Sequence, residues 1–184
     1  MPAANYPRIH LKTTAEWRRW LRDNHATAPG VWLVSWKRSA KKPFVEYEDA
    51  VQEALCYGWI DGQLRPIDDE RSSLLFTPRR AGSAWARSNK ERVKKLIAER
   101  RMRPAGLAKI EAAKRDGSWT LLDSVEALEV PADLRRALAA AGATRAFAAL
   151  SKSAKRAHLY ALVTAKKPET RAKRLADIVR SLGA

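Results

Sequence analysis

Residues 56–89, CYGWIDGQLRPIDDERSSLLFTPRRAGSAWARSN, decide the fold of this chain because they pass from helix through hairpin to helix. Gly58 directly follows a helical apolar pattern, at the position where a left-handed residue ends a helix. Residues 59–65 alternate as a strand, residues 66–70 have turn chemistry, and residues 71–77 form the returning strand. The segment therefore predicts a helix that ends in a β-hairpin.

One face of this predicted hairpin is polar. Strict alternation places Trp59, Asp61, Gln63 and Arg65 on the same side of the strand. Folding about the turn brings Asp61 and Gln63 opposite residues 73–75 of the returning strand. A small domain rarely needs such a face for its core, so we expect it to border a cleft.

Pro78 ends the returning strand, and a helix begins soon afterwards. Either Ser83 or Ser88 is suited to cap it, and Ser88 with Glu91 has the spacing of a capping box. The sequence therefore predicts a strand-to-helix connection that carries Arg79, Arg80 and Trp85.

The region before the hairpin alternates helix and strand signals. Thr13 and Glu16 form a capping box for a helix that runs to about Asn24. Residues 31–36 are aromatic and β-branched, which predicts a strand, and residues 47–57 predict a second helix.

From Pro104 onward the chain is almost wholly helical, with helix starts expected near Pro104, Pro131, Ser151 or Ser153, and Pro168. Residues 123–131 resemble a linker. The predicted fold is α+β: a small antiparallel hairpin or meander packed with helices, followed by an all-helical region. We expect the domains to span residues 1–122 and 123–184.

Composition favours a single folded chain in the cytoplasm. Hydrophobic residues make up 46% of the 184 positions and include seven tryptophans, enough for a substantial core. No run approaches the roughly 18 apolar residues of a membrane span. Residues 1–8 lack a basic segment followed by an apolar one, so no signal peptide is expected. The single cysteine cannot form an internal disulfide.

The chain is strongly basic, with a formal net charge of +16. Residues 79–103 contain ten Lys and Arg against Glu91 and Glu99, a net of +8. Such clustering favours an anionic partner: nucleic acid, anionic lipid or a phosphorylated small molecule. The alternative is a solvated face that only keeps the protein soluble.

Several common sites have no counterpart in the sequence. It contains no Walker or dinucleotide-type glycine loop and no Gly-x-Ser-x-Gly elbow. His10, His25 and His158 are isolated, and Cys56 alone cannot anchor a zinc site, so we expect neither a metal nor a cofactor. Cys56 is expected to be a buried, inert thiol.

Asp61 and the arginine pair are the chemical candidates, each with two interpretations. Asp61 is either a general base or substrate ligand, or the partner of Arg79 or Arg80 that fixes the hairpin. Arg79 and Arg80 either bind an anion at the helix start, or one of them stacks on Trp85 while the other is solvated. The predicted ligand-binding set is Trp59, Asp61, Gln63, Arg79, Arg80, Ser83, Trp85 and Asn89.

The chain resembles the YdeI/OmpD-associated family, also labelled bacteriocin-protection proteins. The resemblance rests on Gly58-Trp59-Ile60-Asp61-Gly62, Thr77-Pro78-Arg79-Arg80, Ser83-x-Trp85, Asn89, Met102-x-Pro104-Ala105-Gly106 and the tail at residues 165–174. It implies a role in tolerance to antimicrobial peptides or other stress, and it provides no catalytic residue.

Three functional hypotheses follow. The first is a protective protein that binds a small or anionic ligand in a cleft walled by Trp59 and Trp85. The second is nucleic-acid binding through the basic 79–103 face. The third is an enzyme in which Asp61 is the acid or base.

Overall fold

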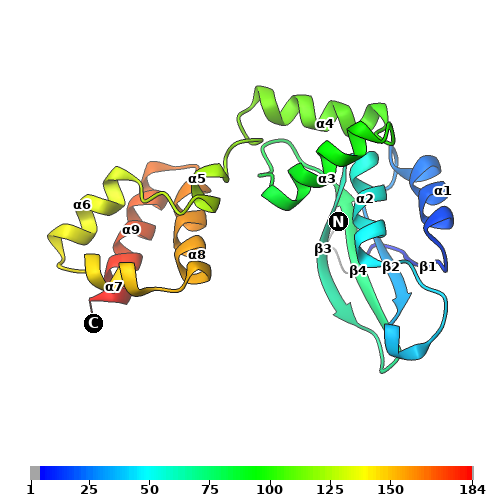
Figure 1. Cartoon of the computed structure of the whole chain (residues 1–184), viewed down its shortest axis with the longest axis horizontal. Helices are drawn as coiled ribbons and strands as arrows, with labels where there is room; N and C mark the ends of the chain where they lie inside the picture. Colours follow the sequence, from blue (N-terminus) through cyan, green and yellow to red (C-terminus); the bar gives the residue numbers. More distant parts are fainter. Residues whose placement is uncertain (1–4, 184) are drawn as a thin grey trace. The chain divides into compact units, whose positions relative to one another are not determined.

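The computed structural model describes residues 5–183 and divides into two compact units after Ser118 (Figure 1). The division from sequence was placed after residue 122. The expectation that residues 1–8 form no signal peptide falls partly on the first four positions. These positions lie outside the described range. Each unit is described by itself.

The first unit contains a four-stranded mixed sheet of order β1-β2-β4-β3. Its strands are β1 (Arg8–His10), β2 (Val31–Trp36), β3 (Trp59–Pro66) and β4 (Arg71–Pro78). β1 pairs parallel with β2, whereas β4 pairs antiparallel with both β2 and β3. The predicted hairpin is thus present, and β1 adds a short strand that the sequence did not indicate.

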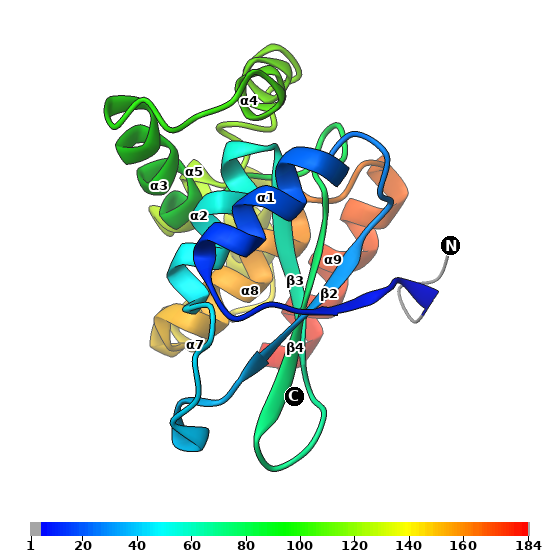
Figure 2. The same cartoon turned by 90° about the vertical axis from the view of Figure 1, so that its right-hand side faces the viewer.

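Four α-helices accompany this sheet: α1 (Thr14–Asn24), α2 (Tyr47–Cys56), α3 (Arg87–Ala98) and α4 (Pro104–Arg115). A short 3₁₀ helix, η2 (Arg38–Ala40), follows β2. Figure 2 shows α1 and α2 side by side in front of the strands. Together with the helical second unit, this confirms the α+β class.

Aromatic side chains fill the layer between these two helices and the sheet. Trp17 of α1 is completely buried, packs 5.0 Å from the ring of Phe76, and donates its indole N–H to the Ala50 carbonyl at 3.0 Å. Trp59 packs edge-on against Trp20, with ring centroids 5.7 Å apart. Trp17 and Trp59 thus supply core volume, as large aromatic side chains commonly do.

Two glycines let α4 pack closely against the end of α2. Gly58 has φ +75° and ends the helix as predicted. A Cβ on Gly106 would lie 2.4 Å from the Cys56 carbonyl oxygen, so no side chain fits at this position. Because the Arg103 amide donates to the same Cys56 carbonyl at 3.1 Å, the helix start is fixed in place.

The alternation predicted for the first hairpin strand is wrong beyond Asp61. The register pairs Asp61 with Phe76 but Leu64 with Leu74, so β3 contains a bulge between Asp61 and Leu64. Two residues therefore separate Asp61 from Leu64 on β3, while a single residue separates their partners on β4. Asp61 is thus not opposite residues 73–75 as expected.

The bulge changes which side chains share a face. Leu64 lies with Leu33 and Leu74 at a groove beside α2. The Arg65 guanidinium instead lies over the Trp32 ring, 4.9 Å from its centroid. The bulge restores Leu64 to the helix-covered face, and Arg65 therefore does not share the face of Asp61.

The predicted cap of α3 is also wrong. The N-cap is Ala86, which makes no side-chain cap hydrogen bond, and Ser88 lies inside the first turn. The Ser88–Glu91 box is therefore not formed. Trp85 is 2% exposed, so burial of this large side chain, rather than a polar cap, accompanies the helix start.

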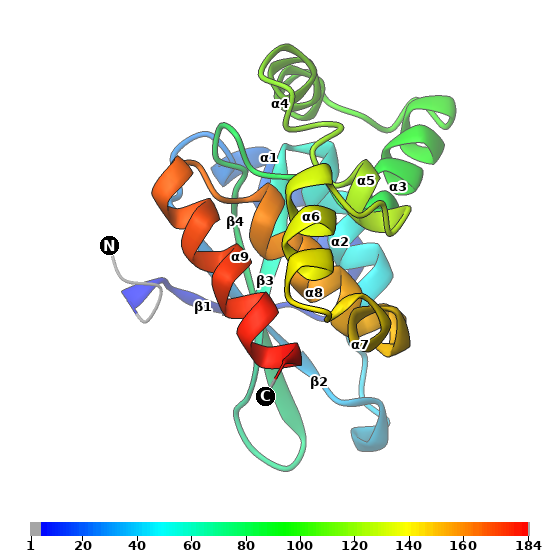
Figure 3. The ribbon, with the colours of Figure 1, turned by 90° about the vertical axis from the view of Figure 1, so that its left-hand side faces the viewer.

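The second unit consists of five helices, namely α5 (Asp123–Glu126), α6 (Ala132–Ala140), α7 (Thr144–Ala149), α8 (Lys152–Val163) and α9 (Pro168–Leu182), within the part of the chain that the structure describes. Figure 3 shows α9 alongside α6 and α8. Ser151 caps α8 through the Ala154 amide, one of the two positions predicted. The stretch expected to be a linker, 123–131, contains α5, so that expectation was wrong.

The helices of this unit are joined by apolar packing and by arginine side chains, among them Arg171. The buried side chains include Leu134, Leu138, Phe147, Leu159, Leu162 and Ile178. Arg171 of α9 binds Asp133 of α6 at 2.7 Å and donates to the Leu162 carbonyl of α8 at 2.9 Å. Arg171 therefore connects three helices.

Within residues 5–183, none of the helices has both the length and the apolar character needed to cross a membrane.

Candidate functional site

The first of the predicted site residues, Trp59, belongs to the core. It is 1% exposed, and its indole N–H donates to the His25 carbonyl at 3.1 Å. This indole N–H is therefore already used, and the ring belongs to the packing around the site rather than to an open cleft wall.

Asp61 lies half-buried on β3 and is held by α2. The Tyr47 hydroxyl donates to Asp61 Oδ2 at 2.8 Å. Burial, reinforced by the hydrogen bond to Asp61, raises the pKa of Tyr47 to about 12. Tyr47 therefore stays a proton donor toward this carboxylate at neutral pH.

Arg79 is the most unusual side chain of the site. Its amide donates to the Gly58 carbonyl at 2.9 Å, which fixes the chain as it leaves β4. Its guanidinium stacks on Trp85, 3.6 Å from the ring centroid, and the residue is only 2% exposed. Nη1 donates to Ser83 Oγ at 3.4 Å and to the Ala84 carbonyl at 3.3 Å.

The other two nitrogens of this guanidinium are unsatisfied. Nε and Nη2 of Arg79 are buried and have no hydrogen-bond partner among residues 5–183. Burial lowers the pKa of Arg79 to about 10, and the negative charge of Asp61 only partly opposes this shift. Buried charges in proteins are normally paired, so this cation lacks a partner that its surroundings require.

A small cavity borders Arg79. Its volume is about 60 Å³. It is lined by the connection from β4 to α3 and by α4, including Arg79, Arg80, Ser83, Trp85, Lys109 and Asp116. The Asp116 carboxylate accepts the amides of Ser118 at 2.9 Å and Gly82 at 3.0 Å, and bonds from these residues lower its pKa. The three cationic side chains outnumber this single, already bonded carboxylate.

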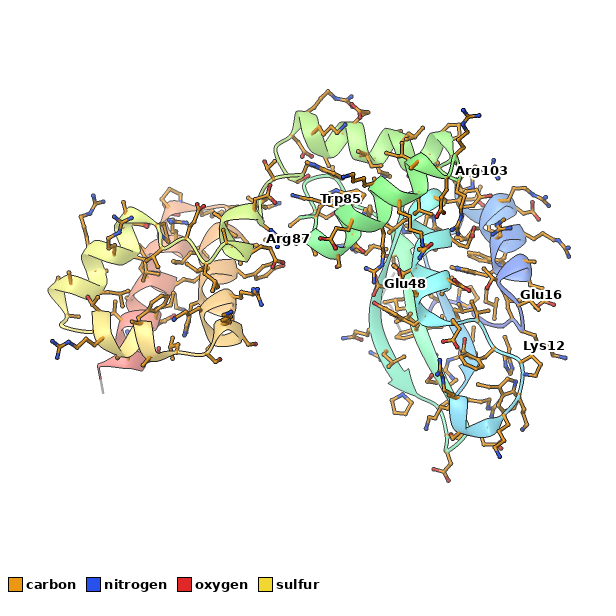
Figure 4. All side chains as sticks on the ribbon, in the orientation of Figure 1. Lys12, Glu16, Glu48, Trp85, Arg87 and Arg103 are labelled. Carbon is orange, nitrogen blue, oxygen red and sulfur yellow. The ribbon has the colours of Figure 1, made fainter. Side chains whose placement is uncertain are left out.

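Asn89 and the first turn of α2 complete the polar surroundings. Arg92 of α3 donates to Asn89 at 2.9 Å and binds Glu48 of α2 at 2.7 Å. The bond from Arg92 lowers the pKa of Glu48 to about 2. Figure 4 shows Glu48 on α2 and Trp85 ahead of α3, both on the side of the unit where α3 lies.

The structure thus does not gather the eight predicted residues at one place, and Trp59 belongs to the core. Arg79, Ser83 and Trp85 are in contact, and the charge of Asp61 acts on Arg79. Arg80 is exposed at the cavity rim, and Asn89 is 7% exposed and bound to Arg92. Gln63 is exposed and accepts a hydrogen bond from Arg65.

Tyr47, Glu48 and Arg92 were missed by sequence reasoning. All three lie on helices that pack together only in the folded chain. The i, i+4 pair Glu48–Gln52, joined at 2.9 Å, was the only local signal that this turn of α2 carries a polar cluster.

Tyr47 also borders a second, apolar hollow. This groove of about 350 Å³ lies beside the start of α2 and includes Leu33, Leu64 and Leu74. Tyr47 and Leu64 are 52% and 67% exposed. The groove therefore adjoins the Asp61–Tyr47 pair on the side of α2.

Fewer cations of the basic 79–103 segment are free to bind an anionic partner than its net charge suggests. Arg79 is buried, Arg92 binds Glu48, and Arg101 binds Glu53 at 2.7 Å. The exposed cations include Arg80, Arg87, Lys94, Arg100 and Arg103. Two of the ten charges are therefore neutralised by α2.

Glu53 is a second buried charge in the first unit. It is 2% exposed, and Oε1 accepts from Arg18 at 2.6 Å and from Arg101 at 2.7 Å. Burial alone would raise the pKa of Glu53, but the bonds from Arg18 and Arg101 outweigh it and lower the pKa. The neighbouring Cys56 thiol has its pKa raised to about 11 by burial, consistent with an inert thiol.

No group of three or more potential metal ligands occurs within residues 5–183. The carboxylates of Glu48 and Glu53 already accept from guanidinium donors.

Two family models match the chain. The model described as a domain of unknown function (DUF8412) covers residues 9–109. The chain belongs to the DUF8412 family. The model described as bacteriocin-protection, YdeI or OmpD-associated covers residues 127–184, so the resemblance noted from sequence is confirmed for the second unit. No curated protein and no solved structure matches the chain.

The DUF8412 match contains Arg79, Ser83 and Trp85 and most of the motifs that suggested the YdeI/OmpD-associated family. Of those motifs, the tail at residues 165–174 lies within the YdeI/OmpD-associated match. The two units therefore match two different family models.

Proposed function

We propose that this protein takes part in protection against antimicrobial peptides or other stress, and that its DUF8412 unit binds a small anion at Arg79. The protective role rests on the description of the family that matches the second unit. The anion site rests on a single observation, the buried Arg79 guanidinium with unpartnered Nε and Nη2.

Several features favour an anion as the missing partner. A carboxylate or phosphate supplies the acceptors that a guanidinium fork lacks and binds it in a planar, bidentate geometry. Arg80 and Lys109 add positive charge to the cavity beside Arg79. Stacking on Trp85 holds the guanidinium plane in one orientation, which favours a planar ligand group.

The size of the cavity limits the ligand. At about 60 Å³ the cavity is far smaller than the roughly 300–1,000 Å³ of typical small-molecule sites. A single carboxylate or phosphate group fits this space, whereas a nucleotide base or sugar ring does not. We infer that an anionic group enters the cavity and that the rest of any larger ligand lies outside it.

The test is anion-dependent stabilisation of the full-length protein. At constant ionic strength, replacing chloride by phosphate or acetate should raise the melting temperature, by the amount expected from linkage, RT ln(1 + [L]/Kd). Arg79→Met should abolish this increase because it removes the fork while keeping an unbranched side chain over Trp85.

Arg87→Met is the matched control. Arg87 is exposed on α3 and does not line the cavity, and its substitution removes the same charge. It should leave the phosphate and acetate response intact. An equal response in wild type and Arg79→Met would show that the anions act on the overall charge of +16 rather than at Arg79.

Nucleic-acid binding is the second candidate, favoured by the exposed arginines and lysines of the 79–103 segment. It predicts affinity for single-stranded or double-stranded DNA or RNA that weakens steeply between low and moderate salt. A charge-removing triple variant, Arg87→Gln, Lys94→Gln and Arg100→Gln, should lose this binding. Absence of a gel shift for the wild type at low salt would eliminate it.

A further inference from the structure

The second unit contains a hollow of about 360 Å³, here called the α6–α8 groove. Its walls come from the segment after α5 and from α6, α7 and α8. It is lined by Leu128, Val130, Arg135, Leu138, Phe147 and Lys155, among others. The whole groove lies within the residues that match the YdeI/OmpD-associated family.

The floor of the groove is apolar and well packed. Leu138 and Phe147 are 3% and 4% exposed, so they belong to the core of the unit and form a rigid base. Leu128 and Val130 are half-buried and line the groove. A volume of this size is at the lower end of the range for small-molecule sites, about 300–1,000 Å³.

Two cations flank this apolar floor, one from α6 and one from α8. Arg135 donates to the Val130 carbonyl at 3.2 Å, and Lys155 donates to the Ala148 carbonyl at 2.7 Å. Each side chain is thereby anchored at the groove wall. A guanidinium has five N–H donors and an ammonium three, so both retain donors after these backbone bonds.

Leu128 brings an apolar side chain to the groove from the end of α5. Its φ is +57°, and the following amide, that of Glu129, donates to the Ser124 carbonyl at 2.9 Å, so Leu128 is the left-handed residue that ends this helix. A glycine would adopt this conformation without strain but would provide no apolar wall.

From the anchored Arg135 and Lys155 beside an apolar floor of Leu138 and Phe147, we propose that the α6–α8 groove binds a small amphipathic carboxylate, such as a medium-chain fatty acid. The alkyl chain lies on Leu138 and Phe147 against Leu128, and the carboxylate accepts hydrogen bonds from both Arg135 and Lys155. The proposal is independent of the anion site at Arg79, which lies in the other unit.

The positive charge and the volume of the groove favour this ligand class over others. Cationic amphiphiles would meet Arg135 and Lys155 with like charge, and neutral alcohols would leave both cations unused. The groove's volume is limited to one short chain, whereas a folded or helical peptide would need anchors over several helical turns.

The test uses full-length protein and three probes with a ten-carbon chain: decanoate and decyltrimethylammonium below their critical micelle concentrations, and decanol below its solubility limit. We expect decanoate to bind most tightly by isothermal titration calorimetry. Arg135→Met and Lys155→Met should each weaken decanoate by about tenfold, because each removes a charged hydrogen bond, and should leave decanol unchanged.

The matched controls are Arg136→Met and Lys152→Met, exposed neighbours on the same helices that do not line the groove. Both should bind decanoate like wild type. Leu128→Gly should weaken decanoate and decanol alike, because it removes the apolar wall, while thermal melting shows that the unit stays folded.

Three outcomes would overturn the proposal. Equal affinity for decanoate and decanol would show that the cations take no part. Equal losses in the groove variants and in the controls would show a general charge effect. Binding of an acidic, apolar peptide with no binding of decanoate would assign the groove to a protein partner instead.

Discussion

Two buried charges of the first unit, Glu53 and Arg79, are each 2% exposed, yet their surroundings differ sharply. Glu53 is bonded by two arginines, Arg18 and Arg101, which join α1 and the segment after α3 to α2. Arg79 has a stacked tryptophan and two weak bonds from one nitrogen, and its other nitrogens have no partner within residues 5–183.

The difference separates structural charge from functional charge. A buried ion with all its hydrogen bonds made contributes to a unique fold, whereas a buried ion with missing bonds is a cost to the free energy of folding. The lowered pKa of Arg79, about 10 against an ordinary 12.5, corresponds to a cost on the order of 3 kcal/mol. A bound anion would reduce this cost, and four predictions test the contrast.

The largest effect is expected at Glu53. Glu53→Gln should lower the free energy of unfolding by about 3 kcal/mol, because it leaves Arg18 and Arg101 without their shared carboxylate. Urea denaturation measures the loss. Glu46→Gln, which breaks the exposed Arg38–Glu46 pair, should cost less than about 1 kcal/mol, and equal losses in the two variants would contradict the contrast.

Gly106→Ala should be next in size. Its Cβ would lie 2.4 Å from a backbone oxygen of α2, so α4 must move, at about 1–3 kcal/mol of unfolding free energy. Gly82 in the Arg79 region has φ +69°, and a Cβ added there would have no neighbouring atom within 4 Å, so Gly82→Ala tests the backbone cost alone. A larger loss at Gly82 than at Gly106 would argue against tight packing of α4 on the end of α2.

Arg79→Met should change stability in the opposite direction from Glu53→Gln. Removing an unpaired buried cation, while an apolar chain still covers Trp85, should leave the protein equally stable or about 1–2 kcal/mol more stable. The measurement is urea denaturation without added phosphate or acetate. A clear loss of stability would give Arg79 a structural role like that of Glu53.

The smallest effect is expected from acid titration of Glu48. Its pKa is lowered from 4.5 to about 2, so the pair with Arg92 stabilises the fold fully above pH 4.5 and is lost as pH falls through 2. Because Glu48 is half-exposed, the contribution should be under about 1 kcal/mol. Glu48→Gln should reduce the difference in unfolding free energy between pH 6 and pH 2.5, whereas Arg38→Gln should not.

Local sequence signals predicted the elements well. The Thr13–Glu16 capping box, Gly58 after α2, Pro104 at the start of α4 and Ser151 before α8 all act as expected. Each of these signals depends on atoms within a few residues of one another, so the sequence alone contains the required information.

The site was harder to predict because its partners come from distant segments. Nothing local indicates that Tyr47 would meet Asp61 or that Arg92 would meet Glu48, since α2 approaches β3 and α3 only after folding. Trp59 and Trp85 have similar sequence surroundings, yet Trp59 packs against Trp20 in the core, whereas the Trp85 ring stacks on the Arg79 guanidinium. The alternating sequence pattern also did not predict the bulge in β3. A single extra residue moves every later side chain of the strand to the opposite face of the sheet.

The bulge also affects whether other protein chains can pair with the edge of the sheet. β3 is an end strand of the sheet, and a long, regular end strand is a template on which strands of other molecules can pair. An extra residue after Asp61, a charged Arg65 and a closing Pro66 interrupt that template along its length. The irregularity that returns Leu64 to the helix side thereby also protects the sheet against edge-to-edge aggregation.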